Sequence, residues 1–318
     1  MEKQNFSRIT PAINIMTRRL QRNSTIDPEL YKKYDVKRGL RDINGHGVMA
    51  GITQVADVQG YETVNGKSVP CEGHLYYRGY DVQDLVRGVI EEKRYGFEEI
   101  TYLFLTGELP SASRLRFFSQ ELDYHRTLPD GFVRDIIMEA PTNDVMNGLA
   151  RSVLTLYTYD DHADDTSLTN VMRQSLQLIA SFPVIASYCY CVYNHYHNGN
   201  SLVLHDPPHG LSHAETILYM IRPDRSYTEL EARMLDLCLI VHADHGGGNN
   251  SAFTTRVVSS AGTDTYSAIA AALCSLKGPK HGGANIKVRH MFEDLKAHVK
   301  DWTDEEELKR YLSTLIYK

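Results

Sequence analysis

The apolar residues of this chain recur at three- and four-residue intervals over most of its length. Five such patterns follow one another with glycine, proline or polar residues between them, at 81–91, 96–110, 113–128, 145–159 and 169–196. Residues at this spacing share one face of an α-helix. Pro183 lies inside the last pattern and is expected to kink or split that helix. Because helices with one apolar face must bury it against other helices, the chain is predicted to be all-α and multihelical.

A short region near the N-terminus breaks this helical pattern. Residues 47–78 alternate β-branched and polar side chains, and Asn65-Gly66 within them is a hairpin-type turn sequence. A short antiparallel β region is therefore predicted there. The first 35 residues are polar, with possible helices near Ile13–Arg22 and Pro28–Lys33, and are interpreted as an N-terminal arm.

Charge, hydropathy and cysteine content argue against a nucleic-acid-binding, a membrane or a disulfide-bonded protein. A net charge of −6 and a pI near 6.2 over 318 residues argue against binding to nucleic acid or to an anionic membrane. No apolar run of about 18 residues, the length of a membrane span, is evident. The five cysteines are odd in number and include no Cys-x-x-Cys, which favours buried, reduced thiols. With no secretory signal evident, a cytoplasmic protein is predicted.

Two histidine motifs bound by glycine are the best candidates for a functional site. In the first, Thr228 and Glu231 form a capping box that opens a helix. Gly246–Gly248 are expected to end this helix, which places His242 and His245 in its last turn. A helix C-terminus favours a cation by roughly 0.3–1 kcal/mol, so His245 is suited to meet an anion.

The second motif presents a histidine at the opposite helix end. Residues 263–265 open an alanine-rich helix from Tyr266 to about Leu276. His281 follows, and a new helical pattern begins after Gly282-Gly283. The positive end of a helix dipole disfavours a cation, so His281 is expected to be neutral and to donate a hydrogen bond.

Three further histidines are spaced as metal ligands could be. His205, His209 and His213 are spaced four apart, which on a continuous helix would suit a metal site. The two prolines and the glycine between them break any helix, so they are interpreted as surface-loop histidines.

Four segments occur in the order and spacing seen in citrate synthases: YYRGYDVQDLV (76–86), FEEITYLFLTGELP (97–110), VHADHGGGNNSAF (241–253) and GPKHGGAN (278–285). From about Arg38 onward the chain closely resembles that family, in its citrate or 2-methylcitrate synthase branch. The resemblance implies a homodimer and three regions along the chain. These are an arm at 1–35, the N-terminal part of a large helical domain at 36–283, and the beginning of a small domain at 284–318.

The resemblance also implies an activity and its residues. The family condenses acetyl-CoA or propionyl-CoA with oxaloacetate and water, giving citrate or 2-methylcitrate plus CoA in the tricarboxylic acid or methylcitrate cycle, without a metal or cofactor. By position in the motifs, His281 would be the catalytic histidine. His245 and Asn249 would bind oxaloacetate, Ser251 would orient the His281 ring, and Lys280 would lie near the acyl-CoA.

Some parts of the family's machinery are not found in these residues. A second catalytic histidine in a Gly-His-x-Val-Tyr motif, a catalytic aspartate and the arginines that clamp the oxo acid are expected further downstream. No Gly-His-x-Val-Tyr segment occurs in the 318 residues. The chain is therefore expected to be truncated, and to be inactive or nearly so by itself.

Two alternative functions stay open at this stage. The first is a metallohydrolase with His242, His245 and His281 as ligands, although no carboxylate partner near the motif is evident. The second is a non-catalytic helical module that only dimerises.

Overall fold

A computed structural model describes residues 27–37, 40–42, 44–45, 47–48 and 51–316. The chain forms two compact units, Met1–Ala50 and Gly51–Lys318. The first contains the helix α2 (Glu29–Lys33), which begins after Pro28 as predicted. The helix predicted at Ile13–Arg22 lies outside the described residues. The boundaries predicted after residues 35 and 283 stay predictions.

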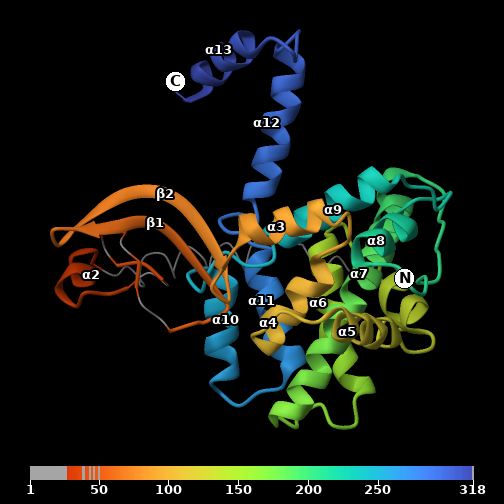
Figure 1. The fold of residues 1–318 in the computed structure, drawn as a ribbon. Coiled ribbons are helices and arrows are strands. Elements are labelled where there is room, and N and C mark those ends of the chain that lie inside the picture. The colour runs from red at the N-terminus through yellow and green to blue at the C-terminus, as the bar shows by residue number, and fades with distance from the viewer. Residues whose placement is uncertain (1–26, 38–39, 43, 46, 49–50, 317–318) are drawn as a thin grey trace, which may run out of the picture. The chain divides into compact units, whose positions relative to one another are not determined.

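A small antiparallel sheet opens the second unit. Its order is β1-β2-β3, formed by β1 (Ala56–Val64), β2 (Lys67–Tyr77) and β3 (Tyr80–Asp81). Asn65 and Gly66 join the first two strands with φ values of 52° and 77°, as a type I′ hairpin turn requires. The predicted short β region is confirmed, and β1 and β2 form the long hairpin labelled in Figure 1.

The rest of the second unit is helical, which confirms the all-α, multihelical fold class. Its α-helices are α3 (Val82–Glu91), α4 (Phe97–Thr106), α5 (Ala112–Tyr124), α6 (Val145–Leu156), α7 (Leu168–Asn198), α8 (His213–Ile221), α9 (Glu229–Val241), α10 (Asn250–Ser259), α11 (Thr265–Leu276), α12 (Ala284–His298) and α13 (Glu305–Ile316). A π-helical turn (Val133–Met138) and a 3₁₀ turn (Tyr157–Tyr159) flank α6. Pro183 does not split α7, which continues through it.

The main core forms where α6, α7 and α11 pack together. Its largest fully buried side chains are Phe132, Val153, Leu156, Ile185, Met220 and Tyr266. Among the described residues, one helix is long and apolar enough to span a membrane, namely α7, which the sequence analysis did not expect. Its most apolar window has a mean hydropathy of 1.5, but 61% of that window is buried inside the protein. A buried core helix meets the same length and composition test, and α7 packs against α6, α8 and α11.

The cysteines agree only in part with the prediction of buried thiols. All five are free, and Cys189 lies buried in α7. Burial raises the pKa of the Cys189 thiol to about 11. Cys238 and Cys274 are exposed, so the prediction is wrong for these two. Both lie on solvent-facing positions of otherwise packed helices, α9 and α11.

The interpretation of three histidines as surface-loop residues is wrong for two of them. His205 and His213 are only 6% and 3% exposed, whereas the His209 side chain is 80% exposed. His213 is the first residue of α8, since the Ser212–Glu215 capping box starts the helix there. The His205 ring has Nε2 3.0 Å from the Arg222 carbonyl oxygen and Nδ1 3.1 Å from Arg225 Nε, and it packs beside the Tyr219 ring.

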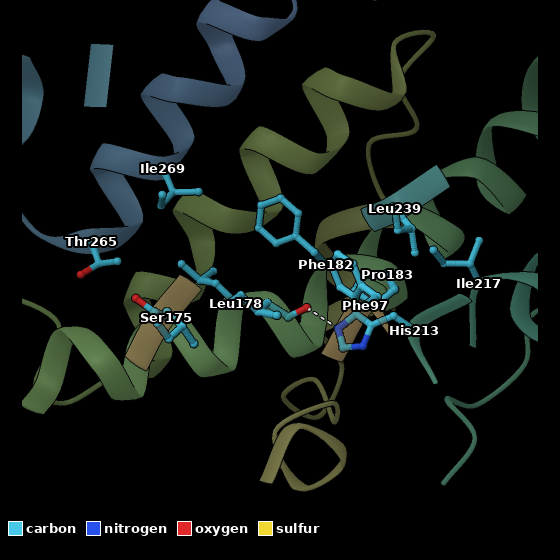
Figure 2. Close-up of a pocket in the computed structure, with 13 residues that line it drawn as sticks. Phe97, Ser175, Leu178, Phe182, Pro183, His213, Ile217, Leu239, Thr265 and Ile269 are labelled. Atoms are coloured by element: carbon cyan, nitrogen blue, oxygen red, sulfur yellow. Dashed lines mark hydrogen bonds between the residues drawn. The ribbon is translucent and has the colours of Figure 1, made fainter. Parts of the chain in front are cut away.

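His213 forms a buried ion pair that links α4, α7 and α8. Its Nδ1 lies 2.9 Å from Glu98 Oε1, and its backbone N–H donates to the same oxygen over 2.8 Å. Its Nε2 lies 3.2 Å from the Ile179 carbonyl oxygen, drawn as a dashed line in Figure 2. Both ring nitrogens of His213 therefore face oxygen atoms. Burial by itself opposes ionisation of Glu98, but the His213 hydrogen bond and charge hold its pKa below its usual value.

A second buried carboxylate caps α4 from a distant helix. Asp236 of α9 is 1% exposed and accepts the backbone N–H groups of Gly96 and Phe97, over 2.8 and 3.2 Å. Gly96 is needed at this helix start, because a Cβ there would lie 2.4 Å from a methyl group of Val89. Burial raises the pKa of Asp236 to about 6, and repulsion from Glu98 contributes.

Asp236 should therefore make stability fall as pH rises from about 4 to 6. The folded protein holds the Asp236 proton more tightly than the unfolded chain, whose aspartates titrate near pH 3.9, so deprotonation in this window favours unfolding. Relative to Asp236→Asn, the wild type is expected to lose roughly 2–3 kcal/mol of unfolding free energy across the window. Urea unfolding of the wild type and of Asp236→Asn at pH 4, 5, 6 and 7 measures the difference in unfolding free energy between them. A difference that stays constant, or that grows in favour of the wild type, contradicts this prediction.

Candidate active site

The first histidine motif follows α9, and the helix ends earlier than predicted. Thr228 and Glu231 form the predicted capping box, but the last helical residue is Val241. His242 is the C-cap, and its Nδ1 lies 2.8 Å from the Cys238 carbonyl oxygen. This contact gives His242 a structural role at the end of α9.

His245 therefore lies outside the helix, and the prediction that it occupies the last turn is wrong. The side chain of Asp244 turns the chain away from helix geometry, because its Oδ1 accepts the Gly246 N–H over 2.7 Å. The helix dipole acts only within the last turn, so it no longer explains a preference of His245 for anions. The His245 side chain is exposed, and no described residue makes a hydrogen bond or ion pair with it.

A helix that the sequence analysis did not predict, α10, begins inside the same motif. Asn249 is its N-cap, with Oδ1 accepting the Ala252 N–H over 2.8 Å. Its Nδ2 donates to the Gly246 carbonyl over 3.3 Å. In this structure both amide atoms of Asn249 thus hold the glycine loop against the start of α10.

The second motif lies between α11 and α12, as predicted. Asp264 caps α11, and His281 lies in the turn that follows it, three residues before α12 begins. The His281 ring is partly exposed, and its Nε2 lies 2.9 Å from the Ser251 hydroxyl oxygen. The structure thus brings the two motifs together through Ser251 and His281, residues 30 positions apart.

One proton on Ser251 decides which nitrogen of His281 is a donor. The Ser251 hydroxyl oxygen also lies 3.1 Å from the Ala272 carbonyl oxygen. A hydroxyl donates a single hydrogen. If it donates to Ala272, Nε2 of a neutral ring must carry the ring proton. If it donates to Nε2, the ring proton lies on Nδ1, which can then donate to a ligand.

The glycines after His281 are required by contact of the chain with itself. The Gly282 N–H donates to the Leu276 carbonyl over 2.9 Å, and a Cβ on Gly282 would lie 2.2 Å from that oxygen. A Cβ on Gly283 would lie 2.3 Å from the Pro279 carbonyl oxygen. A Cβ at either position would therefore overlap a backbone oxygen at or just after the end of α11.

The remaining residues of interest are Lys280 and Tyr77. Lys280 is exposed, and its ammonium group makes no hydrogen bond or ion pair within the described part of the chain.

Tyr77 belongs to the segment at 76–86 that resembles citrate synthases, but the sequence predicted no function for it. It is fully buried, and its hydroxyl contacts the Ile240 and Asp244 carbonyls beside the first motif. The one sequence signal for Tyr77 is its place at the start of Tyr77-Arg78-Gly79 within that segment.

A metal site and an apolar cavity are two other features that could indicate a function. No three histidine, cysteine, aspartate or glutamate side chains among the described residues are grouped to hold a metal ion, so the metallohydrolase hypothesis gains no support. An apolar cavity of about 530 Å³ lies among α4, α7, α8, α9 and α11 (Figure 2). Its lining includes no residue of the two histidine motifs.

Comparisons with known proteins agree on one family. A family model described as "Citrate synthase, C-terminal domain" matches residues 44–316. The chain is 33% identical over 266 residues to a citrate synthase of Haloferax volcanii. The alignment covers 82% of this chain and 62% of that protein. The chain is 31% identical over 264 residues to 2-methylcitrate synthase 1 of Corynebacterium glutamicum, again covering 82% and 62%. The chain thus spans less than two thirds of the length of these relatives.

Solved structures give the same result. The citrate synthase of Pyrobaculum aerophilum superposes with a TM-score of 0.63 at 29% identity, covering 81% of this chain and 62% of that one. The citrate synthase of Thermoplasma acidophilum, in a ternary complex with carboxymethyl coenzyme A and oxaloacetate, gives a TM-score of 0.65 at 26% identity. The alignment covers 77% of this chain and 58% of that one.

Proposed function

Because the chain belongs to the citrate synthase family, we propose that it serves to condense acetyl-CoA or propionyl-CoA with oxaloacetate and water. The products are citrate or 2-methylcitrate and CoA, at the entry to the tricarboxylic acid or methylcitrate cycle. The observation that carries the proposal is the 2.9 Å contact between Ser251 Oγ and His281 Nε2. This contact unites the two histidine motifs in one place. Carboxymethyl coenzyme A and oxaloacetate, bound by the relative from Thermoplasma acidophilum, represent the two substrates.

His281 is the proposed catalytic residue. Removing a proton from the methyl group of a thioester leaves negative charge on the carbonyl oxygen, and a fixed donor to that oxygen is worth about 2.7–4 kcal/mol. In the proposed state, the Ser251 hydroxyl donates to Nε2 instead of to the Ala272 carbonyl, so that Nδ1 carries the ring proton and donates it in a hydrogen bond to the thioester oxygen. Ser251 is thus the orienting residue.

Other residues of the two motifs are proposed to contact oxaloacetate and the acyl-CoA. His245 is the proposed contact for oxaloacetate, with Asn249 supporting it through the glycine loop. The exposed ammonium group of Lys280 is the proposed neighbour of the acyl-CoA. No metal or cofactor takes part in this proposal. Homodimer formation in the cytoplasm belongs to it as well, and sedimentation of the purified chain tests the dimer.

Binding of oxaloacetate tests the proposed roles of the two exposed histidines. His245→Ala is expected to weaken oxaloacetate binding by about tenfold or more, because it removes a hydrogen bond to a charged ligand. His242→Ala is the matched control, since His242 is also exposed but contacts the Cys238 carbonyl, and its binding should stay within about twofold of the wild type. Isothermal titration calorimetry measures both. The proposal fails if the wild type does not bind oxaloacetate, or if the two variants weaken binding equally.

Turnover by the 318 residues alone is expected to be slow. They contain no Gly-His-x-Val-Tyr segment, and proton transfer to and from both substrates needs a second acid–base group besides His281. CoA release that depends on both substrates should therefore lie far below the ordinary enzyme rate of about 10 s⁻¹. A thiol-detection assay on the purified polypeptide measures it, and an ordinary rate overturns this part of the proposal.

A further inference from the structure

Tyr77 joins the end of β2 to the loop that carries His245. Its side chain is 0% exposed, and its ring packs edge-on against Phe104, with centroids 4.8 Å apart. Its hydroxyl lies 2.9 Å from the carbonyl oxygen of Ile240 and 3.2 Å from that of Asp244, and its single hydrogen is shared between the two. These two residues lie 163 and 167 positions later in the chain.

The carbonyls of Ile240 and Asp244 lie at the two ends of the turn that joins α9 to His245. Ile240 is the second-last residue of α9, so its carbonyl is among the four that the helix leaves without their usual partner. The carbonyl of Asp244 belongs to the peptide bond that leads directly into His245. One buried hydroxyl therefore ties the end of the helix to the main chain immediately before the exposed histidine.

The other side of His245 is held by the loop itself. The Gly246 N–H donates to Asp244 Oδ1 over 2.7 Å, and the Gly246 carbonyl accepts from Asn249 Nδ2 over 3.3 Å. The Asp244 carbonyl, by contrast, receives its side-chain hydrogen bond from Tyr77. The turn between α9 and His245 thus depends on a residue of the sheet.

We propose that Tyr77 is a positioning residue for His245. This inference rests on the proposed function, in which His245 contacts oxaloacetate. Tyr77 itself touches no substrate in this account and acts through the backbone at Asp244. Burial raises the pKa of the Tyr77 hydroxyl, so it stays protonated and able to donate at neutral pH.

The test removes a single oxygen atom. Tyr77→Phe keeps the ring that packs against Phe104 and leaves the Ile240 and Asp244 carbonyls without the hydroxyl. Tyr266→Phe is the matched control, because Tyr266 is also 0% exposed. Its hydroxyl lies 2.9 Å from Asp160 Oδ2 and 3.2 Å from Gln177 Oε1, in the main core. Both variants lose a buried hydroxyl, but only one of them borders the His245 loop.

Two readouts separate positioning from a loss of stability. Tyr77→Phe is expected to weaken oxaloacetate binding about tenfold while binding of carboxymethyl coenzyme A stays within about twofold. It should also speed amide hydrogen exchange at residues 242–249 about tenfold, whereas Tyr266→Phe should leave both measurements at wild-type values. Titration calorimetry and exchange measured by mass spectrometry give these quantities on the full 318-residue chain.

The outcomes are distinct. Wild-type exchange at 242–249 in Tyr77→Phe overturns the inference, as does an equal loss of oxaloacetate affinity in both variants. If the wild type binds no oxaloacetate, the proposed function has failed. In that case faster exchange at 242–249 in Tyr77→Phe alone still supports the positioning of this loop by Tyr77, and unchanged exchange overturns it.

Discussion

Replacing His213 by leucine is expected to lower the free energy of unfolding by about 3–5 kcal/mol, because it breaks a buried ion pair. The side chains of His213 and Glu98 are 4% and 10% exposed. Without the imidazole ring, the buried carboxylate of Glu98 loses the side-chain partner that lies 2.9 Å away and keeps backbone N–H donors, among them that of residue 213. It must then keep an uncompensated charge or take up a proton, and both cost stability.

Two further variants make this prediction specific. The double variant His213→Leu with Glu98→Leu is expected to be more stable than His213→Leu alone, since it removes the stranded charge as well. His209→Leu is the control, because His209 pairs with Asp123 over 3.1 Å but its side chain is 80% exposed. That change should stay within about 1 kcal/mol. Urea unfolding measures all three, and equal losses for His209→Leu and His213→Leu contradict the prediction.

Replacing Gly282 by alanine is expected to destabilise the protein by about 1–3 kcal/mol and to separate His281 from Ser251. The new Cβ would lie 2.2 Å from the Leu276 carbonyl oxygen, closer than such atoms can come. The backbone must move away, and this breaks the 2.9 Å hydrogen bond from the Gly282 N–H to the same oxygen. His281 is the neighbouring residue, so its ring must move with the backbone.

Nuclear magnetic resonance of the His281 ring, together with urea unfolding, measures both effects. Gly248→Ala is the matched control in the other motif. A Cβ on Gly248 would meet no atom within 4 Å, and its backbone is outside the left-handed region. Such a change is expected to leave stability unchanged or to raise it by about 0.4–1 kcal/mol. An unperturbed His281 ring in Gly282→Ala would show that the backbone tolerates the added methyl group.

Within the candidate site, the sequence predicted the pairing of Ser251 with His281 but not the backbone conformation around His245. The resemblance to citrate synthases singled out Ser251 and His281, and the structure places them 2.9 Å apart. The same analysis put His245 in the last turn of α9, although that helix ends at Val241. A glycine run is a common helix-ending signal, but the Asp244 side chain and the Tyr77 hydroxyl turn the chain before the glycines are reached.

The sequence by itself determined those features that depend on residues a few positions apart. The sequence predicted the capping box at Thr228, the helix start at Asp264 and the Asn65-Gly66 turn, because each joins groups within four positions of one another. Helical periodicity was readable for the same reason, and with it the all-α class.

Only the tertiary structure decided where distant polar groups found partners. Asp236 caps α4 from 139 and 140 positions away, His213 meets Glu98 across 115 positions, and Tyr77 reaches Asp244 across 167. A buried polar group must be paired, but its residue type states only that it needs a partner and not which one. The packing of helices chooses among the candidates, and here that choice buried His213 and shaped the loop around His245.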